Sequence, residues 1–121
     1  MKLETIRRGG VTIAVVTEGA GITDVDSAME LAMTARYETG ADRIAMDKRL
    51  VCEAFFPLST RLAGEILQKL INYHFKMAVY GDYSHYTSKP LRDFIYESNQ
   101  GNDFFCVTTQ EEALEKLSAA K

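Results

Sequence analysis

The sequence has little of the residues that usually reveal a site directly. Its 121 residues include two cysteines and two histidines, and neither cysteine has a second cysteine or a histidine at metal-ligand spacing. Cys52 and Cys106 lie in apolar stretches, where a free cysteine is usually a core residue. We therefore expect no metal site and no disulfide framework, as is usual in a reducing compartment.

Long apolar runs and a strong charge of one sign are also missing. No segment approaches the roughly 20 apolar residues that cross a bilayer, and the first residues carry no apolar stretch suited to a signal peptide. With 17 acidic against 14 basic residues, the net charge of −3 provides no field that would attract nucleic acid or an anionic membrane. We expect a soluble cytoplasmic protein that binds neither.

The sequence motifs of common enzyme classes are absent as well. There is no phosphate-binding loop of the form G-x-x-x-x-G-K-[ST], no H-E-x-x-H and no G-x-S-x-G. The sequence therefore lacks the motifs by which P-loop nucleotide-binding proteins, zinc proteases and serine hydrolases are usually identified. We assign no catalytic residue and no cofactor. The residues alone establish no activity.

What the sequence does contain is the pattern of one α/β domain over residues 1–121. The apolar fraction of 46% and the charged fraction of 26% are ordinary for a globular domain. Strand-like and helical runs follow one another in the order β-β-α-β-α-β-α-β-α. Because strands that alternate with helices usually pair in parallel through crossovers, we expect a mostly parallel central sheet covered by helices.

Turn and cap signals give approximate bounds for these elements. Gly9-Gly10 between two apolar runs is typical of a hairpin, and further strands are expected over 43–47, 77–80 and 104–107. A capped helix follows Thr23 and is ended by Gly40, and a second helix begins near Ser59-Thr60. The other two are expected to open at Ser88-Lys89-Pro90 and at Thr109.

The densest polar stretch runs from Gly81 to Lys89 and combines a carboxylate, phenols, hydroxyls, an imidazole and an ammonium group. Polar, titratable loops of this kind are suited to ligand recognition. In the structural alternative, Ser88 caps the next helix and the tyrosines pack at the base of the loop. Both interpretations stay open, and the candidate ligand-binding residues are Asp82, Tyr83, Ser84, Tyr86 and Lys89.

A second candidate is an anion or phosphate site at Ser59, Thr60 and Arg61. A helix start offers unpaired N–H groups and a positive dipole end, which favour a bound or covalently attached phosphate. The alternative is an ordinary helix cap with a solvated arginine.

Other polar residues are interpreted as structural. The charged residues around the third strand, Asp47 and Lys48 among them, are expected to form surface salt bridges. His74 is expected to end the second helix, and His85 belongs to the polar loop described above.

Four segments of the sequence carry a resemblance to a known family. Tyr37–Ile44, Leu62–Lys69, Gly81–Ser84 and Leu91–Asn99 resemble a bacterial family catalogued as a domain of unknown function and numbered 4180. The resemblance covers nearly the whole chain, and it implies no activity.

The expected element order also resembles the STAS domain, the fold of the anti-sigma-factor antagonists. In that family a serine or threonine before the second long helix accepts a phosphate, and the resemblance implies Thr60 as the acceptor within Leu58–Leu62. Leu58 and Arg61 stand where the family pattern Asp-Ser-Ser-Gly-Leu has Asp and Gly.

Three hypotheses follow. The first is a non-enzymatic STAS-like regulatory or protein-interaction module. The second is a small-molecule binding protein or enzyme with its site on the loop from Asp82 to Lys89. The third is a homo-oligomer whose exposed strand or helix faces pair.

Overall fold

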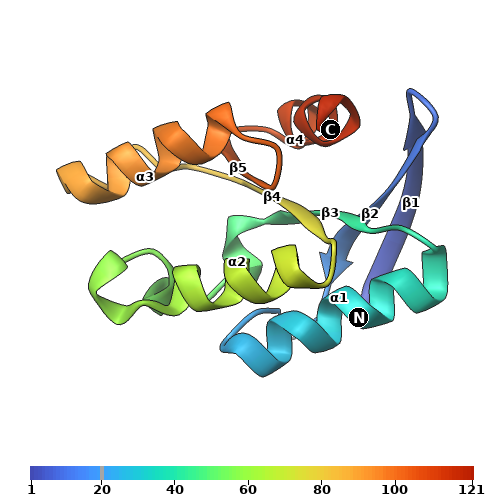
Figure 1. The fold of residues 1–121 in the computed structure, drawn as a ribbon, viewed down its shortest axis with the longest axis horizontal. Coiled ribbons are helices and arrows are strands. Elements are labelled where there is room, and N and C mark those ends of the chain that lie inside the picture. The colour runs from blue at the N-terminus through green and yellow to red at the C-terminus, as the bar shows by residue number, and fades with distance from the viewer. Residues whose placement is uncertain (20) are drawn as a thin grey trace.

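A five-stranded sheet forms the centre of the computed structural model, which describes residues 1–19 and 21–121 (Figure 1). Its strands lie in sequence order, β1-β2-β3-β4-β5. Four strands are parallel, and β1 pairs antiparallel with β2. The strand bounds are Lys2–Arg8 for β1, Val11–Glu18 for β2, Arg43–Asp47 for β3, Lys76–Tyr80 for β4 and Phe104–Val107 for β5.

The sheet is therefore mixed, and the expectation of a mostly parallel sheet is wrong. The reason lies in the hairpin between the first two strands. Gly9 and Gly10 have φ angles of 60° and 79°, a left-handed pair that glycine adopts without steric cost and that fits a tight two-residue turn. The chain reverses there, so that Ile6 pairs with Ile13 in the antiparallel register.

Helices cover both faces of the sheet. The helices α1 (Val25–Thr39), α2 (Leu62–Asn72) and α3 (Lys89–Gln100) connect successive parallel strands and share one hydrophobic core. Crossover connections between parallel strands are nearly always right-handed. The three crossovers here all lead to the next strand in the same direction across the sheet, so their helices lie on the same face. The last helix, α4 (Gln110–Ala119), packs on the other face around a second, smaller core.

The strand sequences divide their side chains between these two cores. In β3, Ile44 and Met46 belong to the core under α1, α2 and α3, whereas Ala45 between them belongs to the core under α4. In β4, Ala78 likewise faces α4. Successive residues of a strand point to opposite faces, and small residues in the two middle strands let the single helix approach closely.

The predicted element order is confirmed, with one change at α2. The cap of α1 is Asp24 with Ser27, one residue later than the Thr23 cap that the sequence suggests, and Gly40 ends the helix in the left-handed conformation as expected. Thr109 caps α4 by accepting from the backbone N–H of Glu112.

The second helix begins at Leu62, later than expected, because Arg61 before it is left-handed with a φ of 62°. Ser59 and Thr60 belong instead to a short 3-10 turn, η3 (Leu58–Thr60). Two further 3-10 turns, η1 (Lys48–Leu50) and η2 (Glu53–Phe55), precede it in the connection from β3.

The β5 edge of the sheet is closed by a side chain. The Asn99 amide of α3 donates to the Cys106 carbonyl (2.9 Å) and accepts from the Cys106 N–H (2.8 Å), as a neighbouring strand would. Within the described residues, no helix has the length and apolar character needed to cross a membrane, and Cys52 and Cys106 are both free thiols.

Candidate functional site

The strand order limits where a ligand crevice can form. In open α/β sheets, crevices arise beyond the carboxyl ends of the strands where the strand order reverses. Here the order runs without reversal from β1 to β5. The loops at this edge instead pack together, since the connection from β3 to α2 lies against the loop from Gly81 to Ser88 through ring contacts of Phe56 with Tyr83 and Tyr86.

Lys48 lies at the centre of this packing. Its Nζ is 4.7 Å from the ring centre of Tyr86 and 4.9 Å from that of Phe56, distances at which a cation is attracted by an aromatic face. It also lies 3.6 Å from Glu53 Oε1, and the Tyr86 hydroxyl donates to Glu53 Oε2 at 3.2 Å. The lysine side chain is 12% exposed. Lys48 therefore links the β3–α2 connection to the loop from Gly81 to Ser88.

A hollow of about 520 Å³ opens beside Lys48 at the carboxyl ends of β3 and β4. The Asp82 carboxylate accepts from the backbone N–H of Ser84 at 2.8 Å. Hydrogen bonds from Ser84 hold the pKa of Asp82 below its ordinary value, with His85 and Lys48 adding a smaller attraction. The charged or titratable residues that line the hollow are Asp47, Lys48, Arg49, Glu53, Asp82 and His85.

The five candidate residues of the polar loop are divided among three hollows. Asp82 lines the one beside Lys48, while Tyr83, Ser84 and Tyr86 line a second of about 510 Å³ against α3. Lys89 lines a third, where its Nζ pairs with Asp93 one helical turn away at 2.7 Å. None of these hollows is lined by all five side chains, and the second and third adjoin through Arg92 and Tyr96.

Tyr83 has a structural role within the loop. Its hydroxyl donates to the Val79 carbonyl at 2.9 Å, and burial raises the pKa of the phenol. Burial also raises the pKa of the nearby Cys106 thiol to about 12, so both groups stay protonated at neutral pH.

The hydroxyls before α2 differ from each other. The Thr60 hydroxyl lies 2.6 Å from the Ala54 carbonyl and 2.9 Å from that of Pro57, and it accepts from the Leu62 N–H at 3.3 Å. It therefore stabilises the turn that starts the helix. Ser59 and Arg61 are exposed, and neither side chain makes a hydrogen bond to another described residue.

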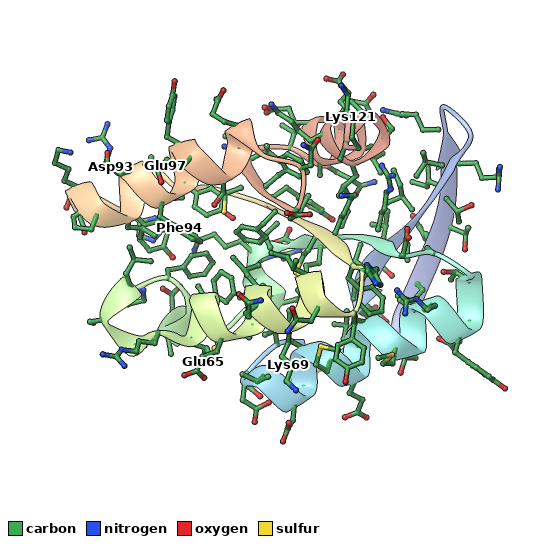
Figure 2. The ribbon with its side chains drawn as sticks, viewed as in Figure 1. Glu65, Lys69, Asp93, Phe94, Glu97 and Lys121 are labelled. Carbon is green, nitrogen blue, oxygen red and sulfur yellow. The ribbon has the colours of Figure 1, made fainter. Side chains whose placement is uncertain are left out.

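The exposed face of α2 forms the floor of a broad open hollow of about 1030 Å³. Val25 of α1 and Phe94 of α3 also line it, and Gly64, near the start of α2, adds no side chain to this surface. Figure 2 shows Glu65 and Lys69 projecting from α2 on the side away from α3. The polar residues that line this hollow are Arg61, Glu65, Gln68, Lys69, Asn72 and Tyr73.

The polar face of α2 can be predicted from the sequence, whereas the contact between Glu53 and Tyr86 cannot. Helical spacing already places Glu65, Gln68 and Lys69 on the polar face of the second helix, although it does not show that the face is hollowed. The pairing of Glu53 with Tyr86 joins residues 33 positions apart, and no local pattern indicates it.

The described residues offer no arrangement of three or more His, Cys, Asp or Glu side chains that could hold a metal ion. The fold and these surfaces define a small α/β domain with a five-stranded mixed sheet, one broad hollow over α2 and smaller hollows near the strand ends.

The comparisons with known proteins assign the domain to a family. The family model described as a domain of unknown function, DUF4180, matches residues 8–117. The chain belongs to this family. No curated protein sequence matches it.

Proposed function

We propose that this chain is a non-enzymatic, STAS-like protein-interaction module that meets its partner through the exposed face of α2. The observation that carries the proposal is the hollow over this helix, which combines charged, amide and aromatic side chains with a glycine near the start of the helix. Exposed hollows with mixed polar and apolar lining are typical of protein contacts.

The order of the elements supports the STAS-like part of the proposal. Sequential parallel strands with three helices on one face and the last helix on the other leave α2 in the middle of its layer. The segment before α2 carries the hydroxyls that resemble the phosphate-accepting position. The resemblance implies Thr60 as the acceptor, but its hydroxyl is hydrogen-bonded within the turn, so we place the phosphate on the neighbouring exposed Ser59. There it would add negative charge at one end of the α2 face and regulate what binds there.

The setting we propose is the cytoplasm. Cys52 and Cys106 are both free, which fits a reducing compartment.

The experiment is site-specific photo-crosslinking in the cells that make the protein. A photoreactive amino acid replaces Gln68, which lies in the α2 hollow, and in a matched control it replaces exposed Lys116 on α4. We expect a discrete crosslinked product from position 68 and none from position 116. Equal products from both positions, or none from position 68, would contradict the proposal.

A second candidate function rests on the hollow beside Lys48. This hollow brings together Asp82, His85 and Lys48, and a concave site with a few converging polar groups is suited to a small molecule. It would make the chain a small-molecule binding protein or an enzyme with a site on the loop from Asp82 to Lys89. Native mass spectra of the protein purified from its source test this: a mass increment that is lost on denaturation, and absent from Lys48→Met, supports it.

A further inference from the structure

The outer face of α2 carries a regular row of side chains. Arg61, Glu65, Lys69 and Tyr73 recur every four residues, are all exposed, and line the hollow described above. Residues four apart lie one above another on a helix, which places Glu65 and Lys69 together on α2, while Arg61 lies just before the helix and Tyr73 just after it. In chain order the row has a positive, a negative and a positive group followed by an aromatic ring. Lys69 Nζ lies 5.9 Å from the ring centre of Tyr73.

The charges of this row form no ion pair with the other described residues. Among the described residues, none of Arg61, Glu65 and Lys69 lies within 4.0 Å of an opposite charge, whereas Lys89 and Asp93 at the same four-residue spacing on α3 do pair. Glu65 and Lys69 at helical spacing, with Arg61 before the helix, therefore remain available for ion pairs with another molecule.

The row is complementary to itself when it is reversed. A second copy of α2, laid antiparallel about a twofold axis between Glu65 and Lys69, places its Lys69 opposite Glu65 and its Glu65 opposite Lys69. The same operation brings Arg61, just before the start of α2, to the end of the second copy's α2, which Tyr73 follows, and cation–π attraction favours a contact between the two. Every contact then occurs twice, as a twofold interface requires.

The neighbouring row allows two helices to approach. Gly64, Gln68 and Asn72 lie beside the charged row, and a Cβ added at Gly64 would meet no atom within 4 Å. The absence of a side chain at Gly64 leaves room for a helix axis at the usual separation of about 8–10 Å. The Gln68 amide donates to the Asn72 side chain at 3.0 Å, which keeps this row ordered.

The edges of the sheet are less suited to pairing. Asn99 already occupies the hydrogen-bonding groups of Cys106 on β5. The other edge strand, β1, exposes Lys2, Glu4 and Arg7, and charged side chains on an edge strand oppose strand addition. A second copy is therefore expected to dock on α2 rather than on either edge strand.

We propose that the α2 face is a self-association surface, on which a second copy of this chain docks antiparallel through two Glu65–Lys69 ion pairs and two Arg61–Tyr73 contacts. The inference rests on the proposed function, because it names the partner of the same α2 face. An interface of one helix from each copy lies at the small end of protein interfaces. The dimer is accordingly weak, and salt weakens it further because its ion pairs are exposed.

Charge exchange tests the pairing directly. Glu65→Lys alone gives a copy with two positive groups in the middle of the row, and Lys69→Glu alone gives one with two negative groups. In sedimentation over a range of concentrations, we expect each single variant to raise the dissociation constant about tenfold or more, because both ion pairs become repulsive. An equimolar mixture of the two variants restores association, since their charges are complementary, and so does the double variant E65K/K69E.

Because both positions are exposed, circular dichroism and thermal melting should be unchanged, which separates lost pairing from lost folding. A wild-type protein that is monomeric at every concentration would overturn the inference. So would single variants that associate as the wild type does, or a mixture that fails to recover.

The photo-crosslink at position 68 separates this inference from the proposed function. A product of twice the chain mass supports self-association. A monomeric chain whose product contains a different protein overturns self-association and leaves the proposed function standing. A dimer that is unaffected by the charge variants and gives no product at position 68 overturns both.

Discussion

The two faces of the sheet are covered by different means. Three helices and a long connection cover one face, where aromatic residues of the β3–α2 connection and of β5 fill the core. A single helix covers the other, over small residues such as Ala45 and Ala78. The first face therefore has a large core and broad surface hollows, and the second has a thin core beneath one element.

The single helix is held by polar contacts at both ends. Near its start, the Arg8 guanidinium binds both carboxylate oxygens of Glu111, at 2.8 and 3.2 Å. Near its end, the Arg43 guanidinium donates to the carbonyls of Leu117 and Ala120, the latter at 2.9 Å. Such contacts satisfy the carbonyls that a helix end leaves unpaired. An arginine also holds the end of α2, where Arg36 of α1 donates to the Tyr73 carbonyl at 2.8 Å. The difference is that α2 is otherwise held by apolar packing and, among the described residues, the charges of its outer face form no ion pair.

The largest expected effect tests the edge of the three-helix face. Gly21 has a φ of 77°, and a Cβ added there would lie 2.1 Å from the Leu50 carbonyl oxygen, which accepts from the Ile22 N–H at 2.8 Å. Gly21→Ala combines backbone strain with a clash against main chain, and we expect it to lower the free energy of unfolding by more than about 3 kcal/mol. Urea unfolding measures the loss.

Gly64→Ala is the matched control for this change. Its added methyl group meets no atom, and alanine favours a helix interior, so we expect a gain of about 0.5–1 kcal/mol. Equal losses from the two variants would show that the contact of Gly21 with Leu50 does not constrain the fold.

The next effect compares one leucine from each face. Leu117 of α4 is 0% exposed and Leu70 of α2 is 2% exposed, so we expect truncation of either to alanine to cost about 2–5 kcal/mol. The variants should differ in amide hydrogen exchange. Leu117→Ala should speed exchange in α4 first, because no second helix supports it on that face, whereas Leu70→Ala should speed exchange across the larger core. Identical exchange maps would contradict the contrast between the faces.

A smaller effect is expected from the contact that holds the end of α4. Arg43→Met keeps most of the apolar stem of the side chain and removes the donors to Leu117 and Ala120, so we expect a loss of about 1–2 kcal/mol by urea unfolding. Arg7→Met, at an exposed arginine that bonds Thr12 in the hairpin, is the control and should change stability by less than about 0.5 kcal/mol. A loss at position 43 no larger than that at position 7 would show that α4 does not need this contact.

Much of the fold could be predicted because its signals are local. The Gly9-Gly10 turn, the cap at Thr109 and the stop at Gly40 each depend on a few neighbouring residues. The start of α2 lies later than the sequence predicts because Arg61 adopts a left-handed conformation. This conformation is typical of glycine, so an arginine at this position does not indicate it. The mixed character of the sheet depends on how the hairpin joins the parallel strands, and strand order is a long-range property.

The candidate sites could be predicted only in part, for a similar reason. Proximity in sequence suggested one site between Asp82 and Lys89, but side-chain direction divides these residues. Lys89 pairs with Asp93 four positions further along α3, a pairing that helical spacing could have suggested. The contact of Glu53 with Tyr86 depends on how two connections meet, which the sequence does not encode locally.

The smallest expected effect concerns the start of α1, on the three-helix face. Asp24 accepts from the Ser27 N–H at 2.7 Å, and this hydrogen bond lowers the pKa of its carboxyl from the ordinary value of 3.8. Since the folded-state pKa is below the unfolded one, the stabilisation is complete above the unfolded value and is lost as the pH falls through the folded value. Asp24→Asn keeps a capping group and should change stability little at neutral pH. Urea unfolding between pH 5 and pH 2.5 should show that the free energy of unfolding falls less steeply with pH for Asp24→Asn than for the wild type. The control is Asp26→Asn, since the Asp26 side chain makes no hydrogen bond to another described residue, and it should show the same pH dependence as the wild type. Equal slopes for the two variants would mean that the cap of α1 is not an acid-sensitive contact of this face.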